Sequence, residues 1–555
     1  MALELGNFQD ANLTADYVAY LVDQQSADAE AHYGRLWDYF RNPLVVAAGA
    51  AADALNESSR PYFQAQETGL PARITGVRRH GGRESLTDLR RKEVVIENDI
   101  AWRVHTMIDF LFGKPVTIRS LADDPQLARI IEQAVAAILD GSGGMSFFQE
   151  LALYGAVYGF VDVALRTPAD GSPEPSPPQG AGRAAPDASA SQADRRPGTP
   201  DNVPGARVES PGQARKPEDG RKDPNGDRSR SRTDRVLEAA RGVQLETVEA
   251  PRILPILDED DYRRVRYWIQ RYHKRPPRLD GTKRSWLRLP WTRRAGASPA
   301  VVEIIEILGA NWWQRYEDRL LVAEGPNSLG RVPVVHVQNV ALPCAYEGLS
   351  DVEPLVPLQD ELNTRLSDRA HRVTYQSFKM YLGKGIDDFL ERPVGPGQMW
   401  STANLQASIE EFGSDSGSPS EDAHIEQVRA AMDKASGVTP LAAGLIRGNV
   451  GNLTSATALK VLLTGLLSRT EKKRLTYGAG IGQIVELALD WLDLAGVLRT
   501  SPRDRRVEVH WPNPLPADEG EALRNAQIKA ALGVPAERIL AELGYDRKTT
   551  DQAAQ

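Results

Sequence analysis

GLSDVEPLVPLQDELNTRLSDRAHRVTYQ, residues 348–376, is the stretch that decides the fold. Its apolar residues recur every three or four positions, which predicts one long helix with a single narrow apolar stripe. The stripe consists of Leu355, Leu358, Leu362, Leu366, Ala370 and Val373. The other faces carry the charged residues Asp360, Glu361, Arg365, Asp368, Arg369 and Arg372. Such a helix needs one partner face, and its charges are either solvated or paired with those of another copy of the chain.

The overall composition is that of an ordinary globular protein with an acidic balance. The 555 residues include 67 Lys and Arg against 75 Asp and Glu, which gives a formal net charge of -8. The length predicts two or more domains, because single cores stop growing at about 250–300 residues. Proteins that grip nucleic acid tightly are usually basic, so we expect any contact with DNA to be loose.

The cysteine count and the lengths of the apolar runs further narrow the class of protein to which the chain can belong. A single cysteine, Cys344, excludes an intrachain disulfide and zinc sites built from several cysteines. The first residues, MALELGNFQDANLTADYVAY, lack the charged-then-apolar pattern of a secretory signal. No run of about 18 apolar residues occurs, so no membrane span is predicted. These features favour a soluble protein that is made inside a cell.

Helices and short strands are both predicted, which indicates an α+β fold. One helix ends at Phe112, stopped by Gly113 and Pro115, and a second covers about 125–139. Residues 147–166 read as a helix passing into a strand. Between about 240 and 340, segments rich in β-branched and aromatic residues predict a small antiparallel sheet. In it, Trp312 and Trp313 point to opposite faces, one to the core and the other to a possible interface.

The tract 167–235 has a different composition from the rest. It is dense in Pro, Gly, Ser and charged residues and contains almost no large apolar side chain. Because it lacks the surface to offset its chain entropy, we predict a disordered insertion within a domain.

Six further segments follow the helix quoted first. Short strands and turns are predicted after it, then a helix over 421–436 and a Gly- and Asn-rich loop over 438–453. A helix over 454–495 would be about 60 Å long, with a bend at its glycines 478, 480 and 482. A last strand within 505–514 and a terminal helical pair complete the chain.

Signatures of catalysis are absent: no phosphate-binding loop, no zinc-protease motif and no nucleophile elbow occurs. The acidic run Asp258–Asp261 has two readings, a Mg²⁺ site or a hydrated turn, and the turn is favoured. We therefore predict no catalytic residue, no metal and no cofactor.

The order of four segments resembles the portal proteins of tailed bacteriophages, of the siphophage head-to-tail connector type. These segments are IENDIAWRVHTMIDFLFGKPVTI (96–118), YGAVYGFVDVAL (154–165), LGRVPVVHVQN (329–339) with the helix quoted first, and GNVGNLTSATALKVLL (448–463). The resemblance covers about residues 90–500. The tract 167–235 departs from it, because the family does not explain such an insertion.

The resemblance implies a division of the chain into named parts. Residues 1–347 would form the wing, with its small antiparallel sheet and the disordered insertion 167–235. Residues 348–378 and 423–437 would be the two stem helices, with the clip at 379–422 between them. The tunnel loop would be 438–453, the long bent helix and a returning wing strand 454–517, and the crown 518–555.

The resemblance also implies a non-enzymatic function. Twelve copies would form a ring at a unique capsid vertex and act as a conduit for double-stranded DNA in packaging and ejection. The large terminase subunit, the major capsid and scaffolding proteins and the head–tail connector or neck proteins would be partners, in the virion and in the host cytoplasm during assembly. Binding to DNA would be non-specific, through Arg447, Asn449 and Asn452 of the tunnel loop, and no membrane would be involved. The charges 360, 361, 365, 368, 369 and 372 would lie at the subunit interface. A metal-dependent nucleic-acid enzyme and a helical scaffold or adaptor are the alternatives.

Overall fold

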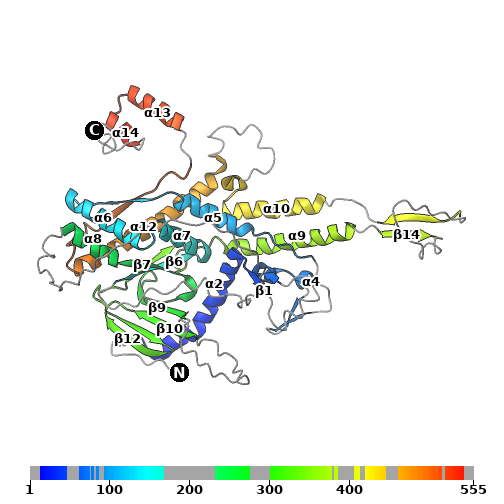
Figure 1. Ribbon diagram of the computed structural model, residues 1–555, viewed down its shortest axis with the longest axis horizontal. Coiled ribbons are helices and arrows are strands. Elements are labelled where there is room, and N and C mark those ends of the chain that lie inside the picture. Colours follow the sequence, from blue (N-terminus) through cyan, green and yellow to red (C-terminus); the bar gives the residue numbers. More distant parts are fainter. Residues whose placement is uncertain are drawn as a thin grey trace, which may run out of the picture.

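The protein is elongated, with a body of sheets and helices and a helical pair that projects from one end (Figure 1). The computed structural model describes residues 13–46, 62–75, 77–80, 83–86, 93–167, 232–274, 301–377, 380–384, 405–412, 419–444, 461–515 and 519–542. Within these parts, helices and small antiparallel sheets both build the body, which confirms the predicted α+β class. None of the helices described is long and apolar enough to span a bilayer.

The larger sheet has five antiparallel strands in the order β12-β11-β10-β9-β8. They are β8 (Ile253–Leu257), β9 (Val265–Lys274), β10 (Val302–Leu308), β11 (Trp312–Glu317) and β12 (Leu320–Pro326). Trp312 and Trp313 lie on opposite faces of β11, as predicted, and each is only 8% exposed. They belong to two different hydrophobic clusters, so both tryptophans are interior residues rather than one of them facing an interface.

The N-terminal helices begin on one face of this sheet. They are α1 (Ala15–Tyr20), the π-helix η1 (Leu21–Gln25) and α2 (Ser26–Arg41). Val18, Leu21 and Val22 form one apolar cluster with sheet residues such as Tyr267 and Ile305. Small elements follow: β1 (Leu44–Val46), β2 (Tyr62–Gln64), the 3₁₀ helix η2 (Ala65–Gly69), α4 (Ala72–Thr75), β3 (Val77–His80) and β4 (Arg83–Leu86).

A second, three-stranded sheet lies beside the first and has the order β13-β6-β7. Its strands are β6 (Phe160–Arg166), β7 (Gln244–Val248) and β13 (Val334–Gln338). The sequence placed the 334–338 strand in a single sheet with its neighbours in the chain, whereas it pairs with β6. The helix α8 (Arg232–Gly242) leads into β7, and the 3₁₀ helix η4 (Ala250–Arg252) leads out of it.

A buried ion cluster joins the two sheets. Arg166 of β6 pairs with Glu246 at 2.8 Å and with Glu306 of β10 at 3.0 Å, and its Nη2 donates to Gln270 at 3.1 Å. Arg166, Glu306 and Gln270 are almost completely buried. The contact between the sheets is therefore polar at its centre, and its stability depends on complete pairing.

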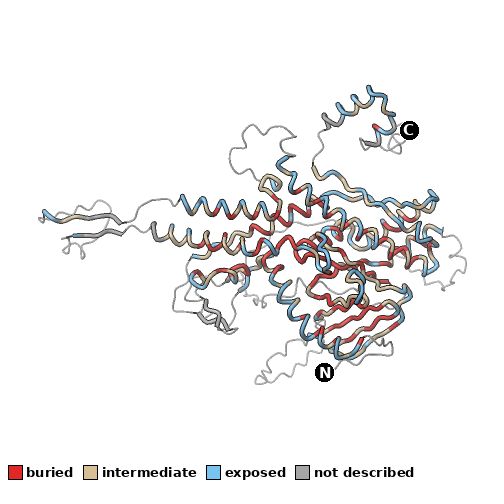
Figure 2. The backbone as a smooth tube through the Cα atoms, turned by 180° about the vertical axis from the view of Figure 1, so that it is seen from behind, coloured by how far each residue is buried: buried red, intermediate tan, exposed pale blue. Residues whose placement is uncertain are grey.

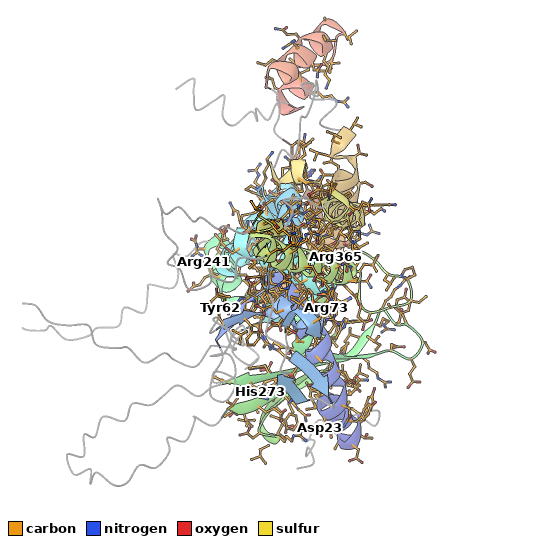
Figure 3. The ribbon with its side chains drawn as sticks, turned by 90° about the vertical axis from the view of Figure 1, so that its right-hand side faces the viewer. Asp23, Tyr62, Arg73, Arg241, His273 and Arg365 are labelled. Carbon is orange, nitrogen blue, oxygen red and sulfur yellow. The ribbon has the colours of Figure 1, made fainter. Side chains whose placement is uncertain are left out.

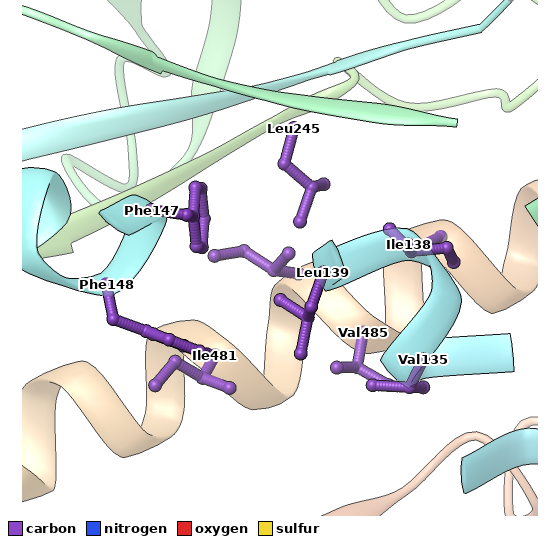
Figure 4. A pocket seen from close by; sticks show the side chains of 10 residues that line it. Val135, Ile138, Leu139, Phe147, Phe148, Leu245, Ile481 and Val485 are labelled. Carbon is purple, nitrogen blue, oxygen red and sulfur yellow. The ribbon is translucent and has the colours of Figure 1, made fainter. Parts of the chain in front are cut away.

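Four helices and the three-stranded sheet form most of the core (Figure 2). They are α5 (Asp99–Phe112), α6 (Pro125–Gly141), α7 (Met145–Tyr158) and α12 (Thr464–Leu494). Where α6, α7 and α12 meet, Ile138, Phe148 and Ile481 line an apolar space that holds at most about one water (Figure 4). The strand pair β5 (Thr117–Ser120) and β16 (Val507–His510) closes this layer, so the predicted strand within 505–514 is confirmed.

The helix predicted over 454–495 corresponds to α12, but it is interrupted at a different place. It runs without a break through Gly478, Gly480 and Gly482, and a turn at Leu463 separates it from the helical residues 461–462. A Cβ on Gly480 would lie 2.5 Å from the side chain of Val337, so this glycine lets β13 approach the helix.

The remaining elements are the projection, the short helix that follows it and the last two helices of the chain. The 3₁₀ helix η5 (Glu353–Leu355), α9 (Val356–Ser377) and α10 (Pro419–Ser436) form the projection, with the hairpin of β14 (Met380–Lys384) and β15 (Ser408–Phe412) at its far end. The short helix η7 (Pro440–Ala443) follows α10. The terminal pair α13 (Glu519–Ala531) and α14 (Ala536–Glu542) lies apart from the projection (Figure 1). Of the predicted disordered tract, residues 168–231 lie outside the described parts, and α8 already begins at Arg232.

Candidate functional site, the helical pair α9 and α10

The projecting helices α9 and α10 run side by side in opposite directions (Figure 1). The predicted stripe of α9 is buried near the body, where Leu355 and Leu362 are fully covered and Leu358 and Leu366 pack against the core. The facing residues of α10 are Ile425, Val428 and Met432. The stripe fades outward, because Val373 is 52% exposed. The apolar stripe therefore holds the pair together at its base.

Charged residues hold the pair together further out. The six α9 charges predicted at a subunit interface all have partners within the same chain. Asp360 accepts a hydrogen bond from the Tyr39 hydroxyl at 2.5 Å. Glu361 pairs with Arg365 at 2.7 Å and with His424 at 3.1 Å, and Asp368 pairs with Arg73 and, at 3.8 Å, with Arg365. Arg369 pairs with Asp422 at 2.9 Å, and Arg372 pairs with Glu421. Arg73 of α4 and Arg365 of α9 both contact Asp368, and Figure 3 labels these two arginines. These pairings neither require nor exclude a neighbouring copy, so the interface role stays a prediction.

Two of these carboxylates differ in their electrostatic surroundings. Burial raises the pKa of Asp360 above its ordinary value, although the Tyr39 hydroxyl and Arg35 act in the opposite direction. Burial also acts to raise the pKa of Glu361, but His424 and Arg365 outweigh it and hold this pKa below the ordinary value. Asp360 is thus turned toward the body, and Glu361 belongs to the contact between α9 and α10.

Gln359, Asn363 and Ser367, one helical turn apart on α9, bind the extended segment 95–99. The backbone amides of residues 99, 97 and 95 donate to these three side chains in that order, each at 3.0 Å. The Gln359 amide and the Ser367 hydroxyl donate back to the carbonyls of residues 97 and 95. We call these three side chains the polar ladder. The polar ladder gives the backbone of residues 95–99 the hydrogen-bond partners that a neighbouring strand would give. It thereby connects α9 to the start of α5.

The polar ladder leads to a prediction for Asn363. Replacing Asn363 with Ala should lower the free energy of unfolding by about 2–3 kcal/mol, because the amide of residue 97 and the buried side chain of Gln66 each lose a partner. Chemical denaturation measures this loss. Gln427 on the exposed face of α10 is the matched control, and Gln427→Ala should change stability by less than about 0.5 kcal/mol. Equal losses in the two variants would contradict the role of the ladder.

The base of α9 is fixed by Ser350 and Asp351. The Ser350 hydroxyl donates to the carbonyl of Val157 at 2.6 Å and accepts from the amides of Val352 and Glu353. The amide of Asp351 donates to Ala156 at 2.8 Å. The end of α7 and the start of the projection are therefore one continuous hydrogen-bonded unit.

The segment after α10 begins on the core. Ser436 accepts from the amide of Val438, and Gly437 adopts a left-handed φ of 71°. Val438 is completely buried in a small cluster with Met107 and Leu466. The predicted DNA-contacting residues Arg447, Asn449 and Asn452 lie outside the described residues.

The acidic run Asp258–Asp261 forms a turn between β8 and β9. Asp258 accepts from the amide of Asp260, and Asp261 accepts from that of Arg263, each at 3.0 Å. The favoured reading of this run as a turn is thus confirmed. Nowhere in the described ranges do three or more His, Cys, Asp or Glu side chains gather as a metal would require.

The comparison with protein-family models agrees with the resemblance found in the sequence. The family model for phage portal proteins, SPP1 Gp6-like, matches residues 308–551, a little under half of the chain. The chain is also similar to one in the virion of a native gene transfer agent particle, with 11% identity, a TM-score of 0.40, and coverage of 80% of this chain and 90% of the other. A chain in the neck of an empty gene transfer agent particle is also similar, with 11% identity, a TM-score of 0.41, and coverage of 81% of this chain and 90% of the other. A search of curated proteins found no match. Residues 308–551, which include the projecting pair, α12 and the pair α13 and α14, are thus similar to the phage portal proteins of the SPP1 Gp6-like family.

Proposed function

We propose that this chain is the subunit of a ring at a unique capsid vertex, through which double-stranded DNA enters during packaging and leaves during ejection. The observation that carries the proposal is the family match over 308–551, because this range contains α9, α10 and α12 together. In this reading the helices α9 and α10 are the stem, β14 and β15 belong to the clip, α12 crosses the wing, and α13 and α14 form the crown. The chain has no enzymatic role, and terminase, capsid and neck proteins dock on the ring.

The charge of the chain fits a channel through which DNA slides. Twelve copies with a net charge of -8 each give 12 × -8 = -96. Tight binding needs several cations placed against phosphates, and an acidic wall with few such contacts keeps the affinity low and independent of sequence. Identical head-to-tail contacts close into a ring when the rotation per copy divides the full circle evenly.

Electron microscopy of the purified full-length protein tests the proposal. We expect rings with a central hole, and the number of subunits in top views gives the copy number directly. A strict monomer under all assembly conditions would contradict the proposal. Metal-dependent cleavage of DNA that disappears in Asp260→Asn would replace it with a nuclease.

The loop 438–453 gives a second, independent prediction. Deleting residues 447–452, or replacing Arg447 with Ala, should leave rings intact and lower the yield of packaged DNA at least about tenfold, because the groups proposed to touch phosphates are lost. Protection of DNA from nuclease in a packaging reaction measures the yield. Loss of rings in these variants would show that the loop is structural instead.

A further inference from the structure

Three residues of α12, spaced one turn apart, reach the segment that precedes α9. Arg469 contacts Asp351 at 2.9 Å, Lys473 forms an ion pair with the same carboxylate, and the Tyr477 hydroxyl donates to Asn339 at 3.1 Å. The Asn339 amide in turn donates to Asp351 at 2.9 Å. Asp351, Asn339 and Tyr477 are essentially inaccessible to solvent. One face of α12 is therefore fixed to the base of α9.

Arg469 has a second set of contacts that its neighbours lack. Its Nη1 donates to the carbonyls of Ala435 and Ser436, each at 3.0 Å. These are the last carbonyls of α10, where a helix has acceptors without partners and a partial negative charge. Arg469 is thus shared between the end of α10 and, through Asp351, the start of α9.

The charges show why these two roles of Arg469 are separable. Burial acts to raise the pKa of Asp351, but Lys473 and Arg469 outweigh it and hold this pKa below the ordinary value. Burial lowers the pKa of Lys473 against the attraction of Asp351, and the nearby Arg469 adds to the lowering. Two cations share one carboxylate, and the fully buried Lys473 already neutralises it. The charge of Arg469 is therefore available to the end of α10.

We propose that Arg469 is a positioning residue that couples the C-terminal turn of α10 to the base of α9 and so sets where the chain leaves α10 for 438–453. The neighbouring geometry supports this role. Val438 is buried against α5, and a Cβ on Gly437 would lie 3.7 Å from the carbonyl of Gly465 at the start of α12. The coupling stands on contacts within the single chain and does not depend on the proposed function.

Hydrogen–deuterium exchange on the full-length protein tests the coupling. In Arg469→Gln, amides 437–442 should exchange at least about tenfold faster, because the last carbonyls of α10 lose their cation, whereas residues 351–360 and the unfolding midpoint should change little. Arg469→Lys should give an intermediate rate, because one ammonium cannot reproduce the two-sided contact of a guanidinium. Arg474→Gln, on the same helix, is the control and should leave amides 437–442 unchanged.

Two results would overturn the coupling. Unchanged exchange at 437–442 in Arg469→Gln would show that Arg469 does not hold the end of α10. Equal acceleration at 437–442 and 351–360 with a lowered unfolding midpoint would show general stabilisation instead. Neither readout uses rings or DNA, so a failure here is distinguishable from a failure of the portal proposal.

Discussion

Replacing Gly159 with Ala should destabilise the protein by about 4 kcal/mol or more, enough to abolish accumulation of the native state. Gly159 ends α7 with a φ of 94°, a region in which a side chain is strained. A Cβ there would lie 2.3 Å from the carbonyl oxygen of Gly348. The close approach is mutual, because a Cβ on Gly348 would lie 2.4 Å from the carbonyl oxygen of Gly159. Soluble yield and the midpoint of chemical denaturation measure the effect.

The chain offers a matched control for the backbone strain alone. Gly496 has a similar φ of 70°, and nothing lies within 4 Å of its Cβ position. Gly496→Ala should therefore cost only the strain of the left-handed backbone, about 1–2 kcal/mol. The difference between the two variants isolates the close approach at the base of the projection. If Gly159→Ala lost no more stability than Gly496→Ala, that close approach would be refuted.

Arg166→Met should cost about 3–5 kcal/mol, because it leaves Glu306 and Glu246 as buried carboxylates without their main cation. The expected loss is large because water cannot reach the contact between the two sheets, where Glu306 is completely buried. Chemical denaturation followed by tryptophan fluorescence measures it, since Trp268 and Trp313 lie in the larger sheet.

A double variant separates charge from packing at the same place. Arg166→Met combined with Glu306→Gln removes one anion along with the cation, so it should lose at least about 1 kcal/mol less than Arg166→Met alone. If the single variant lost under about 1 kcal/mol, the cluster would not hold the sheets together. If the double variant lost more than the single one, packing rather than charge would dominate.

Local patterns predicted the elements of this fold well. The helix that ends at Phe112, the helix that begins at Pro125 and the long helix quoted first are all present, because each has a clear apolar period and a definite start or stop. The division of the strands between the five-stranded and the three-stranded sheet was not predictable in the same way. The strand 334–338 pairs with β6, far away in sequence, and no turn signal marks such a pairing.

The polar ladder and Arg469 show what sequence reasoning missed at the site. Gln359, Asn363 and Ser367 look like solvated residues, since the segment they bind lies more than 250 residues earlier in the chain. Their spacing of four, with amide and hydroxyl groups only, was the available signal. The sequence leaves the charges of α9 either solvated or paired with another copy, and it does not show that Arg369 and Arg372 reach Asp422 and Glu421, because those pairings depend on how α10 lies against α9.

The projection holds its outer hairpin away from the core. The helices α9 and α10 leave and re-enter the body side by side. Near the outer end of the pair, Arg369 and Arg372 of α9 form ion pairs with Asp422 and Glu421. The hairpin of β14 and β15 lies beyond these ion pairs, at the far end of the projection (Figure 1). A change in the sequence or length of that hairpin should therefore leave the stability of the core unchanged.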